Sequence, residues 1–380
     1  MQIVEFFIKV ARLVIYSLKG NFEYAFGQFE YTNFIRRKSL HWYYSRNEIK
    51  SNNVAVFDLK HAKDRYAFNL INTYKLADYD VFLKPNYHFY VNSEGLYFED
   101  IFSFLNVGYF RGSFKSGQYK LIHYVYDHND IKLKVIPNNV KLIKVTSENA
   151  IGTQALKFPF GFHPNTYKRF NITTNSQLKE VLYRGSNEHG YKIVFAGSTK
   201  GNDYDKIKSN FPELMTRNEV FEEIHKSYNK EISTNYKLRD GRPILISDSL
   251  KGERISEDKL FEIFKNSDFF IAPPGFEMPF CHNLFEATSC GLVPIIQYSN
   301  YLYPNLQHEV NCLIFKNTTS LKQCINQALN MELESIKKMK KNILHYHRSY
   351  LSPSSFVNRI ENEKHKDKVV YYISSPSKNK

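Results

Sequence analysis

The stretch from Ser267 to Tyr298, SDFFIAPPGFEMPFCHNLFEATSCGLVPIIQY, decides the predicted fold of the second half of the chain. It opens with an apolar run, breaks at Pro273-Pro274-Gly275, continues with helical spacing around one acid, Glu286, and stops at Gly291 before a second apolar run. This order predicts a strand, a helix and a parallel strand. Ligands of open α/β sheets bind beyond the carboxyl ends of the strands, so chemistry is expected just after the first strand.

The same alternation extends in both directions from this stretch. Upstream, an apolar strand at 52–59, a helical pattern at 61–79 and a strand at 80–85 form a β-α-β unit. Further strands are predicted at 120–127 and 140–146 in the first half, and at 191–197, 242–249 and 311–315 in the second. Helices are predicted at 255–267 and 320–331, with Ser256 as the N-cap of the first.

Two successive α/β series predict an α/β fold of two Rossmann-like domains that face a central cleft. The segment between Gly152 and Tyr191 is rich in Pro, Gly and aromatic residues and has no period, which indicates a domain boundary. We therefore expect an N-terminal helix at 1–20, a first domain at 21–185, a second domain at 186–350, and a C-terminal helix with a polar tail at 351–380.

The first 20 residues, MQIVEFFIKVARLVIYSLKG, are apolar but interrupted by charges. Because of these charges, no uninterrupted apolar run in the segment reaches the roughly 18 residues that a membrane span needs. Glu5, Lys9, Arg12 and Lys19 fall on one side of a helix, so the segment is expected either to lie in a membrane interface or to pack on the protein's own core.

The composition favours an anionic partner. The net charge is +14, which suits nucleic acid, an anionic membrane face or a phosphorylated substrate. The many Tyr and Phe side chains leave open a nucleic-acid-binding protein that stacks bases, although no nucleic-acid motif is present. The four cysteines form no C-x-x-C pair, which indicates free thiols in a reducing, cytoplasmic compartment.

The residues around Glu286 form a candidate ligand site. Gly275 allows a ligand to approach the backbone or allows a positive φ, and His282 lies one turn before Glu286 on the same helix face. A carboxylate can accept hydrogen bonds from two sugar hydroxyls. Glu286→Ala is therefore expected to weaken ligand binding with little loss of folding stability.

This stretch consists of a strand, the motif P-x-G, several residues, and then the motif E-A-x-x-x-G-x-x-P-I-I. That order resembles the donor-site segment of GT-B nucleotide-sugar glycosyltransferases, and is most similar to the exostosin-like group. KIVFAGSTKGN similarly resembles the first strand and loop of that family's C-terminal domain. The resemblance covers about Tyr191 to Phe315. It departs from the commoner pattern in two places: the upstream acid Glu277 stands nine positions before Glu286 instead of eight, and His282-Asn283 stand where the exostosin-like group often has Arg.

The resemblance implies a donor site and a reaction. Glu286 would bind the ribose or sugar of the donor, together with Gly275, His282, Asn283, Gly197, Ser198, Lys200 and Arg254. The last four would lie near the diphosphate or supply positive charge. The enzyme would move a sugar from a nucleotide-sugar co-substrate, without another cofactor, to a glycan or lipid-linked acceptor. Such a role fits bacterial surface polysaccharide synthesis, in the cytoplasm or at the inner face of the membrane.

Inverting transfer also needs a base near the acceptor hydroxyl. The candidates are Asp58 and His61, then Asp127 and His128, and then His163, because each follows a predicted strand or lies near the domain boundary. No metal is expected, because the two D-x-D matches, at 78–80 and 203–205, do not lie in suitable loops. The alternative functions are a nucleic-acid-binding protein and a non-catalytic sugar-binding scaffold.

Overall fold

We describe the protein from a computed structural model. The structure describes residues 53–62, 64–84, 89, 97–109, 120–129, 138–146, 156–159, 161–183, 190–199, 201–237, 240–250, 255–276, 278–362 and 367–371. The helix expected at 1–20 lies outside these residues. Among the residues described, no helix is long and apolar enough to cross a membrane.

The first sheet has seven strands in the order β3-β2-β1-β4-β5-β13-β6. Its strands are β1 Asn53–Asp58, β2 Asp80–Leu83, β3 Gly108–Tyr109, β4 Leu121–Tyr126, β5 Val140–Thr146, β6 Leu156–Lys157 and β13 Asp367–Tyr371. Helix α2, Asp64–Leu76, connects β1 to β2, and those two strands pair in parallel with Val54 opposite Asp80. The predicted β-α-β unit is confirmed. Helix α4, Phe98–Ser103, lies in the connection between β2 and β3.

The second sheet has six strands in the order β12-β11-β10-β7-β9-β8. Its strands are β7 Ile193–Gly197, β8 Ile232–Ser233, β9 Ile244–Asp248, β10 Phe269–Ala272, β11 Val293–Ile296 and β12 Leu313–Ile314. All pairings described between these strands are parallel. Strands β10 and β11 are buried along their whole length, as expected for a parallel sheet covered on both faces.

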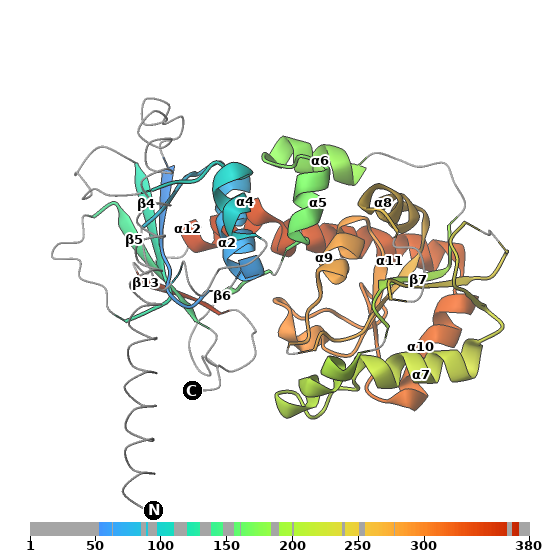
Figure 1. Cartoon of the computed structure of the whole chain (residues 1–380). Coiled ribbons are helices and arrows are strands. Elements are labelled where there is room, and N and C mark those ends of the chain that lie inside the picture. Colours follow the sequence, from blue (N-terminus) through green and yellow to red (C-terminus); the bar gives the residue numbers. More distant parts are fainter. Residues whose placement is uncertain are drawn as a thin grey trace, which may run out of the picture. The chain divides into compact units, whose positions relative to one another are not determined.

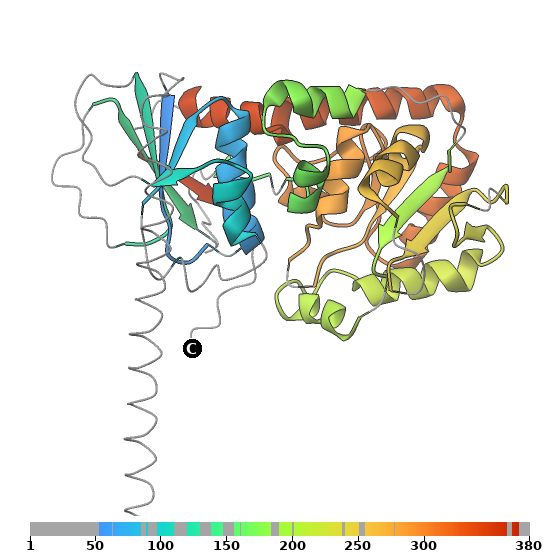
Figure 2. The same cartoon turned by 45° about the horizontal axis from the view of Figure 1, so that its top comes forward.

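Helices surround the second sheet on both faces (Figures 1 and 2). Helices α7 Arg217–Tyr228 and α10 Thr318–Asn330 pack together on one side. Helices α8 Glu257–Asn266, α9 His282–Ser289 and α11 Leu333–Tyr346 lie on the other, where α9 contacts both α8 and α11. The remaining helical segments are α5 Pro164–Arg169, α6 Asn175–Tyr183, η2 Asn202–Ser209, η3 Ser299–Tyr301, η4 His347–Leu351 and α12 Pro353–Asn362.

The chain divides into two compact units, and the described residues from 53 to 68 and from 79 to 141 belong to the first, those from 69 to 78 and from 142 to 371 to the second. An α/β fold built on parallel sheets, as expected from the sequence, is confirmed. The domain boundaries at residues 20, 185 and 350 stay predictions. The interval 351–380, expected to be a helix and a polar tail, holds α12 and also β13, which pairs with β5. The four cysteines are free thiols.

Candidate functional site

A pocket of about 300 Å³ lies at the carboxyl ends of β7 and β9 in the second sheet. That volume is at the lower end of the range for small-molecule sites, about 300–1,000 Å³. Its walls come from these strands, from α8 and α9, and from the segment that starts α5: His163, Thr166, Ala196, Gly197, Ser247, Ser249, Ile255, Glu257, Leu260, Asn283 and Glu286. The structure therefore brings together four of the residues predicted from the sequence, His163, Gly197, Asn283 and Glu286.

Glu286 is fixed in this pocket through one of its two carboxylate oxygens. The residue is only 2% exposed. The Thr166 hydroxyl donates to Oε1 at 2.7 Å, and the His163 backbone amide donates to the same oxygen at 3.1 Å. Within the described part of the chain, Oε2 has no donor, so it is available to a ligand in the pocket.

The pKa of Glu286 is raised by its surroundings. Burial is the main cause, because it penalises the charged form, and the nearby carboxylate of Glu257 adds to it. The hydrogen bonds from Thr166 and His163 act in the opposite direction. A ligand that donates hydrogen bonds to Oε2 would stabilise the charged form further.

Gly197 ends β7 in a conformation that a side chain would oppose. Its φ is +147°, and a Cβ there would lie 3.3 Å from Nδ2 of Asn283. The Asn283 amide in turn donates to the Ala196 carbonyl. Glycine is needed here so that the backbone and the Asn283 side chain can share this edge of the pocket.

Ser247 is a pocket residue that the sequence did not single out. It belongs to β9, pairs with Ala196 of β7, and is 6% exposed. No described residue hydrogen-bonds to its hydroxyl, although the residue lines the pocket. Because Ser247 lines the pocket, its hydroxyl can contact a ligand atom.

His163 lines the pocket as the N-cap of α5. Its Nδ1 accepts from the Asn165 amide at 3.2 Å. In the neutral ring, with Nδ1 accepting, Nε2 carries the proton and is a donor, and the role of His163 as a base stays a prediction.

His282 does not line the pocket. Its Nδ1 lies 3.1 Å from the Gly161 carbonyl oxygen, which can only accept, so Nδ1 donates. Its ring meets His163 edge-to-face at 5.1 Å. The predicted donor contact of His282 stays a prediction, and the described contacts give it a positioning role for the segment before α5.

Gly275 is required by the backbone beside it. A Cβ would lie 2.6 Å from the Met278 carbonyl oxygen, and the Gly275 amide donates to the Pro279 carbonyl at 3.1 Å. Its φ is not positive. The tight turn after β10 explains this glycine without a ligand.

Arg217 is a second residue that the sequence did not single out. It is 7% exposed, and it donates to the carbonyl oxygens of Pro274 and Ser198, each at 3.0 Å. It also lies over the Tyr204 ring, 4.3 Å from the centroid. None of its described partners is a carboxylate. A buried cation therefore joins the loops that follow β7 and β10, which include the predicted residue Ser198.

Two predicted diphosphate cations, Lys200 and Arg254, lie outside the described residues, and neither acid of the D-x-D match at 203–205 lines the pocket. Asp203 pairs with Lys206, and Asp205 accepts from Asn218 at 3.1 Å. Across the described ranges, no three His, Cys, Asp or Glu side chains form a group that could hold a metal ion.

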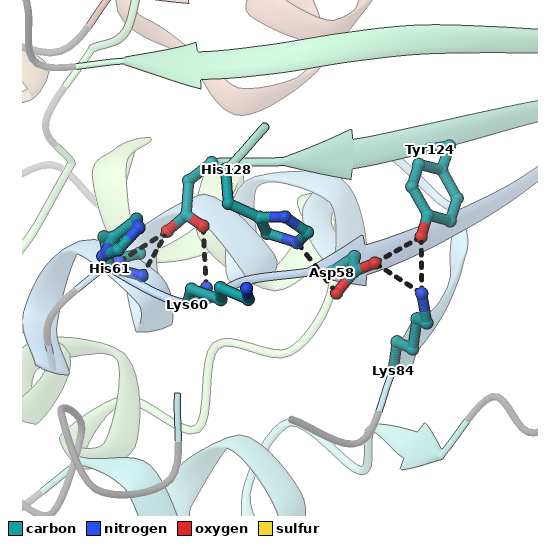
Figure 3. Close-up of polar contacts among 8 residues, drawn as sticks. Asp58, Lys60, His61, Lys84, Tyr124 and His128 are labelled. Carbon is teal, nitrogen blue, oxygen red and sulfur yellow. Dashed lines mark hydrogen bonds and ion pairs between the residues drawn. The ribbon is translucent and has the colours of Figure 1, made fainter. Parts of the chain in front are cut away.

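Asp58 lies at the carboxyl end of β1 in the first sheet, inside a polar cluster (Figure 3). Lys84 Nζ donates to its Oδ2 at 2.6 Å, and the Tyr124 hydroxyl donates to the same oxygen. Nε2 of His128 lies 3.2 Å from Oδ1. Burial acts to raise the pKa of Asp58, but these hydrogen bonds outweigh it and the net shift is downward. A buried carboxylate with a lowered pKa and two donors on Oδ2 is poorly suited to act as a general base, and the role of Asp58 stays a prediction.

The backbone around His61 is held by a neighbouring carboxylate (Figure 3). Asp127 accepts from the amides of Lys60, His61 and Ala62 at 2.7, 2.8 and 2.6 Å. The residue His61 itself is exposed. Its ring can therefore reach a ligand at the carboxyl edge of the first sheet, and its role as a base stays a prediction.

The chain matches no protein-family model and no curated protein. Solved structures similar to it include a glycosyltransferase from Rickettsia africae ESF-5, with a TM-score of 0.42, 11% identity, and coverage of 82% of this chain and 97% of that one. HepE from Anabaena in complex with UDP-glucose has a TM-score of 0.39 and 9% identity, covering 81% and 98%. Sucrose-phosphate synthase from Thermosynechococcus elongatus has a TM-score of 0.37 and 11% identity, and the match covers 81% of this chain and 97% of that one. Because these scores are below 0.5, the function of this chain has to be argued from its own residues.

Proposed function

We propose that the chain is a GT-B glycosyltransferase that moves a sugar from a nucleotide-activated donor to a glycan or lipid-linked acceptor. The pocket of the second sheet is its donor site. The observation that carries the proposal is the position of Glu286, which is buried, held at Oε1 by Thr166 and His163, and directed into the pocket.

A carboxylate held in this way suits a ribose or a sugar. An ionised carboxylate only accepts hydrogen bonds, and charge-assisted bonds are about twice as strong as neutral ones. Neighbouring hydroxyls of a sugar ring supply donors, and the Asn283 amide and Ser247 hydroxyl on the same pocket wall can complete the contact. The sequence resemblance of the β10–α9–β11 segment to donor sites of the exostosin-like group supports the same assignment.

Positive charge for the diphosphate is available at the loop after β7, which begins next to the pocket residue Gly197. Arg217 holds the Ser198 carbonyl, at the loop after β7, with no described carboxylate partner. We assign it the role of diphosphate cation, together with Lys200 and Arg254 as expected from the resemblance. These cations would make the reaction independent of a metal ion, since they can balance the charge of the leaving nucleotide.

The acceptor side is proposed from charge and from the N-terminal segment. A net charge of +14 favours association with an anionic membrane that carries a lipid-linked acceptor. Peripheral attachment through residues 1–19 would place the enzyme at the inner face of a bacterial membrane. If deleting these residues leaves the protein folded and still bound to anionic vesicles, the attachment proposal is wrong.

The donor site is tested by calorimetric titration of the full chain with nucleoside diphosphates and their sugar conjugates. Wild type is expected to bind one of them, and Glu286→Gln should reduce that affinity roughly ten- to hundredfold. Glu223→Gln is a matched control, because Glu223 lies on α7, pairs with Lys322 and does not line the pocket. Loss of affinity in both variants, or in neither, would contradict the proposed role of Glu286.

Sugar transfer itself needs a second measurement. Release of nucleoside diphosphate from a bound nucleotide-sugar, in the presence of membrane extract as acceptor, should be fast in wild type and reduced in Glu286→Gln. Binding without any release would favour the non-catalytic sugar-binding scaffold.

A further inference from the structure

One side of α11 carries a row of exposed basic side chains. Lys338, Lys341 and His345 are exposed and stand three and four positions apart, so they lie on the same side of the helix. Lys337 borders this row, and Arg348 follows it in η4; both are exposed. We call these five residues the basic stripe. The opposite side of α11 is buried in the second unit.

Positive charge is segregated in this part of the chain. Between Glu334 and Glu361 the sequence has six Lys or Arg residues and no Asp or Glu. Within the described part of the chain, no hydrogen bond or ion pair engages the side chains of Lys338, Lys341 and His345. These basic groups are therefore available to a partner outside the molecule.

The acids near the stripe have partners of their own. Glu334, one turn before Lys338, pairs with Lys337 at 2.8 Å. Glu309, in the loop beside α11, accepts a hydrogen bond from Gln327 of α10 at 2.5 Å. These two carboxylates are thus engaged elsewhere, and the other lysines of the stripe keep their attraction for an external anion.

Exposed apolar side chains flank the stripe. Leu333, the first residue of α11, is 60% exposed. Two side chains of α11 donate to the carbonyls of Pro304, at 2.6 Å, and Val310, at 3.0 Å, and so hold a loop along the helix. This loop presents Tyr303 and Val310, which are 53% and 42% exposed. Three of the five large apolar side chains that are exposed among the described residues therefore lie at α11.

This combination of basic and apolar groups fits an anionic lipid surface. Lys and Arg are attracted to anionic headgroups, while Tyr and aliphatic side chains enter the interface between headgroups and acyl chains. A nucleic acid would also attract the lysines, but its phosphates offer nothing to the aliphatic side chains of Val310 and Leu333. A second copy that met this face with its own would bring like charges together.

We propose that α11 docks the second unit on an anionic membrane surface, with the basic stripe on the headgroups and Tyr303, Val310 and Leu333 between them. This inference rests on the membrane attachment proposed above, but on different residues. None of these residues lines the pocket, so the contact leaves the donor site open. Residues 1–19 and this face would act as two weak contacts, which together hold a surface far better than either one alone.

The charge contribution is tested by co-sedimentation of the full chain with vesicles of equal parts phosphatidylglycerol and phosphatidylcholine. The double variant Lys338→Gln with Lys341→Gln should bind them roughly thirtyfold more weakly, about fivefold for each lysine. Lys226→Gln with Lys230→Gln is the control of equal net charge, because these exposed lysines lie at the end of α7, on the other side of the second sheet (Figure 1). The control should bind nearly as wild type, and melting temperatures report whether both variants fold.

The apolar contribution separates a membrane from a nucleic acid. Leu333→Ser with Val310→Ser keeps the net charge, and it should weaken vesicle binding roughly tenfold. Its affinity for a single-stranded oligonucleotide should equal that of wild type. If this variant binds vesicles as wild type does, and the lysine variant loses the oligonucleotide, the stripe is a nucleic-acid surface and the membrane assignment is wrong.

The remaining outcomes separate this inference from the proposed function. Equal losses in the lysine variant and its control would overturn it, because net charge alone would then attract the vesicle. No loss in the lysine variant, with release on deletion of residues 1–19, would overturn docking by α11 and leave the proposed attachment intact. Failure of wild type to bind any vesicle would overturn both. Failure of wild type to bind any nucleoside diphosphate would overturn the donor site and leave docking by α11 standing.

Discussion

The Thr166 hydroxyl donates a 2.7 Å hydrogen bond to Oε1 of Glu286, across 120 positions of sequence. Both residues are buried, at 3% and 2% exposure. This bond fixes the orientation of the carboxylate and directs its second oxygen toward the pocket. It also ties α9 to the segment that starts α5, so the residue proposed to bind the donor contributes to stability as well.

Glu286→Ala is accordingly expected to cost folding stability, contrary to the expectation from the sequence. The variant leaves the Thr166 hydroxyl and the His163 amide without their acceptor, and each such buried group costs about 1–3 kcal/mol. Glu286→Gln keeps an acceptor oxygen and should lose less. Urea unfolding of both variants measures the difference, and equal stability of wild type and Glu286→Ala would contradict it.

The bond itself can be measured with a double-mutant cycle. Thr166→Val and Glu286→Gln, alone and combined, should show a coupling free energy of about 0.5–3 kcal/mol in urea unfolding. Additive effects would mean that the hydrogen bond does not contribute to stability.

Asp58 is expected to make the first sheet sensitive to acid. Its folded pKa is lowered, below its unfolded value of about 3.9. The unfolded chain therefore takes up the proton first as the pH falls, so the stabilising contribution is present above about pH 3.9 and is lost as the pH falls through the folded pKa. Asp58→Asn should be less stable than wild type at pH 7, and the gap between them should narrow below pH 4. Unfolding free energies measured from pH 7 to pH 3 check this; a constant gap would argue against it.

Arg217 is expected to contribute to binding of the diphosphate. Arg217→Lys keeps the charge but loses the planar set of donors that now reaches Pro274 and Ser198. Affinity for the preferred nucleoside diphosphate should fall roughly tenfold, while affinity for the matching nucleoside should change little. Arg242→Lys is the control, because Arg242 also donates to a carbonyl, that of Ile232 at 2.6 Å, but stands before the amino end of β9, whereas the pocket lies at the carboxyl end of that strand. An equal loss of nucleoside and diphosphate would mean that Arg217 only supports the loops.

Gly197 and Gly241 separate backbone strain from contact with the pocket. Both have positive φ, +147° and +76°, but a Cβ on Gly241 would meet nothing within 4 Å, whereas one on Gly197 would lie 3.2 Å from the Phe195 ring and 3.3 Å from Nδ2 of Asn283. Each Gly→Ala change should cost about 1–3 kcal/mol in thermal or urea unfolding. Only Gly197→Ala should also weaken nucleotide binding; if Gly241→Ala weakens it equally, the contacts with Phe195 and Asn283 at the pocket edge are not the cause.

The sequence by itself determined the strands β7, β9, β10, β11 and β12 of the second sheet, whereas the short strand β8, Ile232–Ser233, was not predicted. Strands β10 and β11 are short apolar runs bounded by Pro and Gly, and α9 between them has helical spacing, so local pattern was sufficient. The position of Glu286 in a helix that follows a strand and a turn was also predicted from this local pattern. Gly197 was also correctly placed at the end of its strand, because small residues after an apolar run mark a turn.

The tertiary structure alone decided which groups meet. Thr166, Ser247 and Arg217 carry no local signal, because their neighbours in space are distant in sequence. The sequence also did not predict why position 275 must be glycine, since the Met278 carbonyl oxygen is the group that excludes a side chain there. Strand β13 joins β5 from more than 200 residues away, and no local pattern encodes such a pairing. Periodicity reports which face of an element is buried, whereas hydrogen-bond partners depend on how the chain folds back on itself, and that depends on the packing of the whole unit.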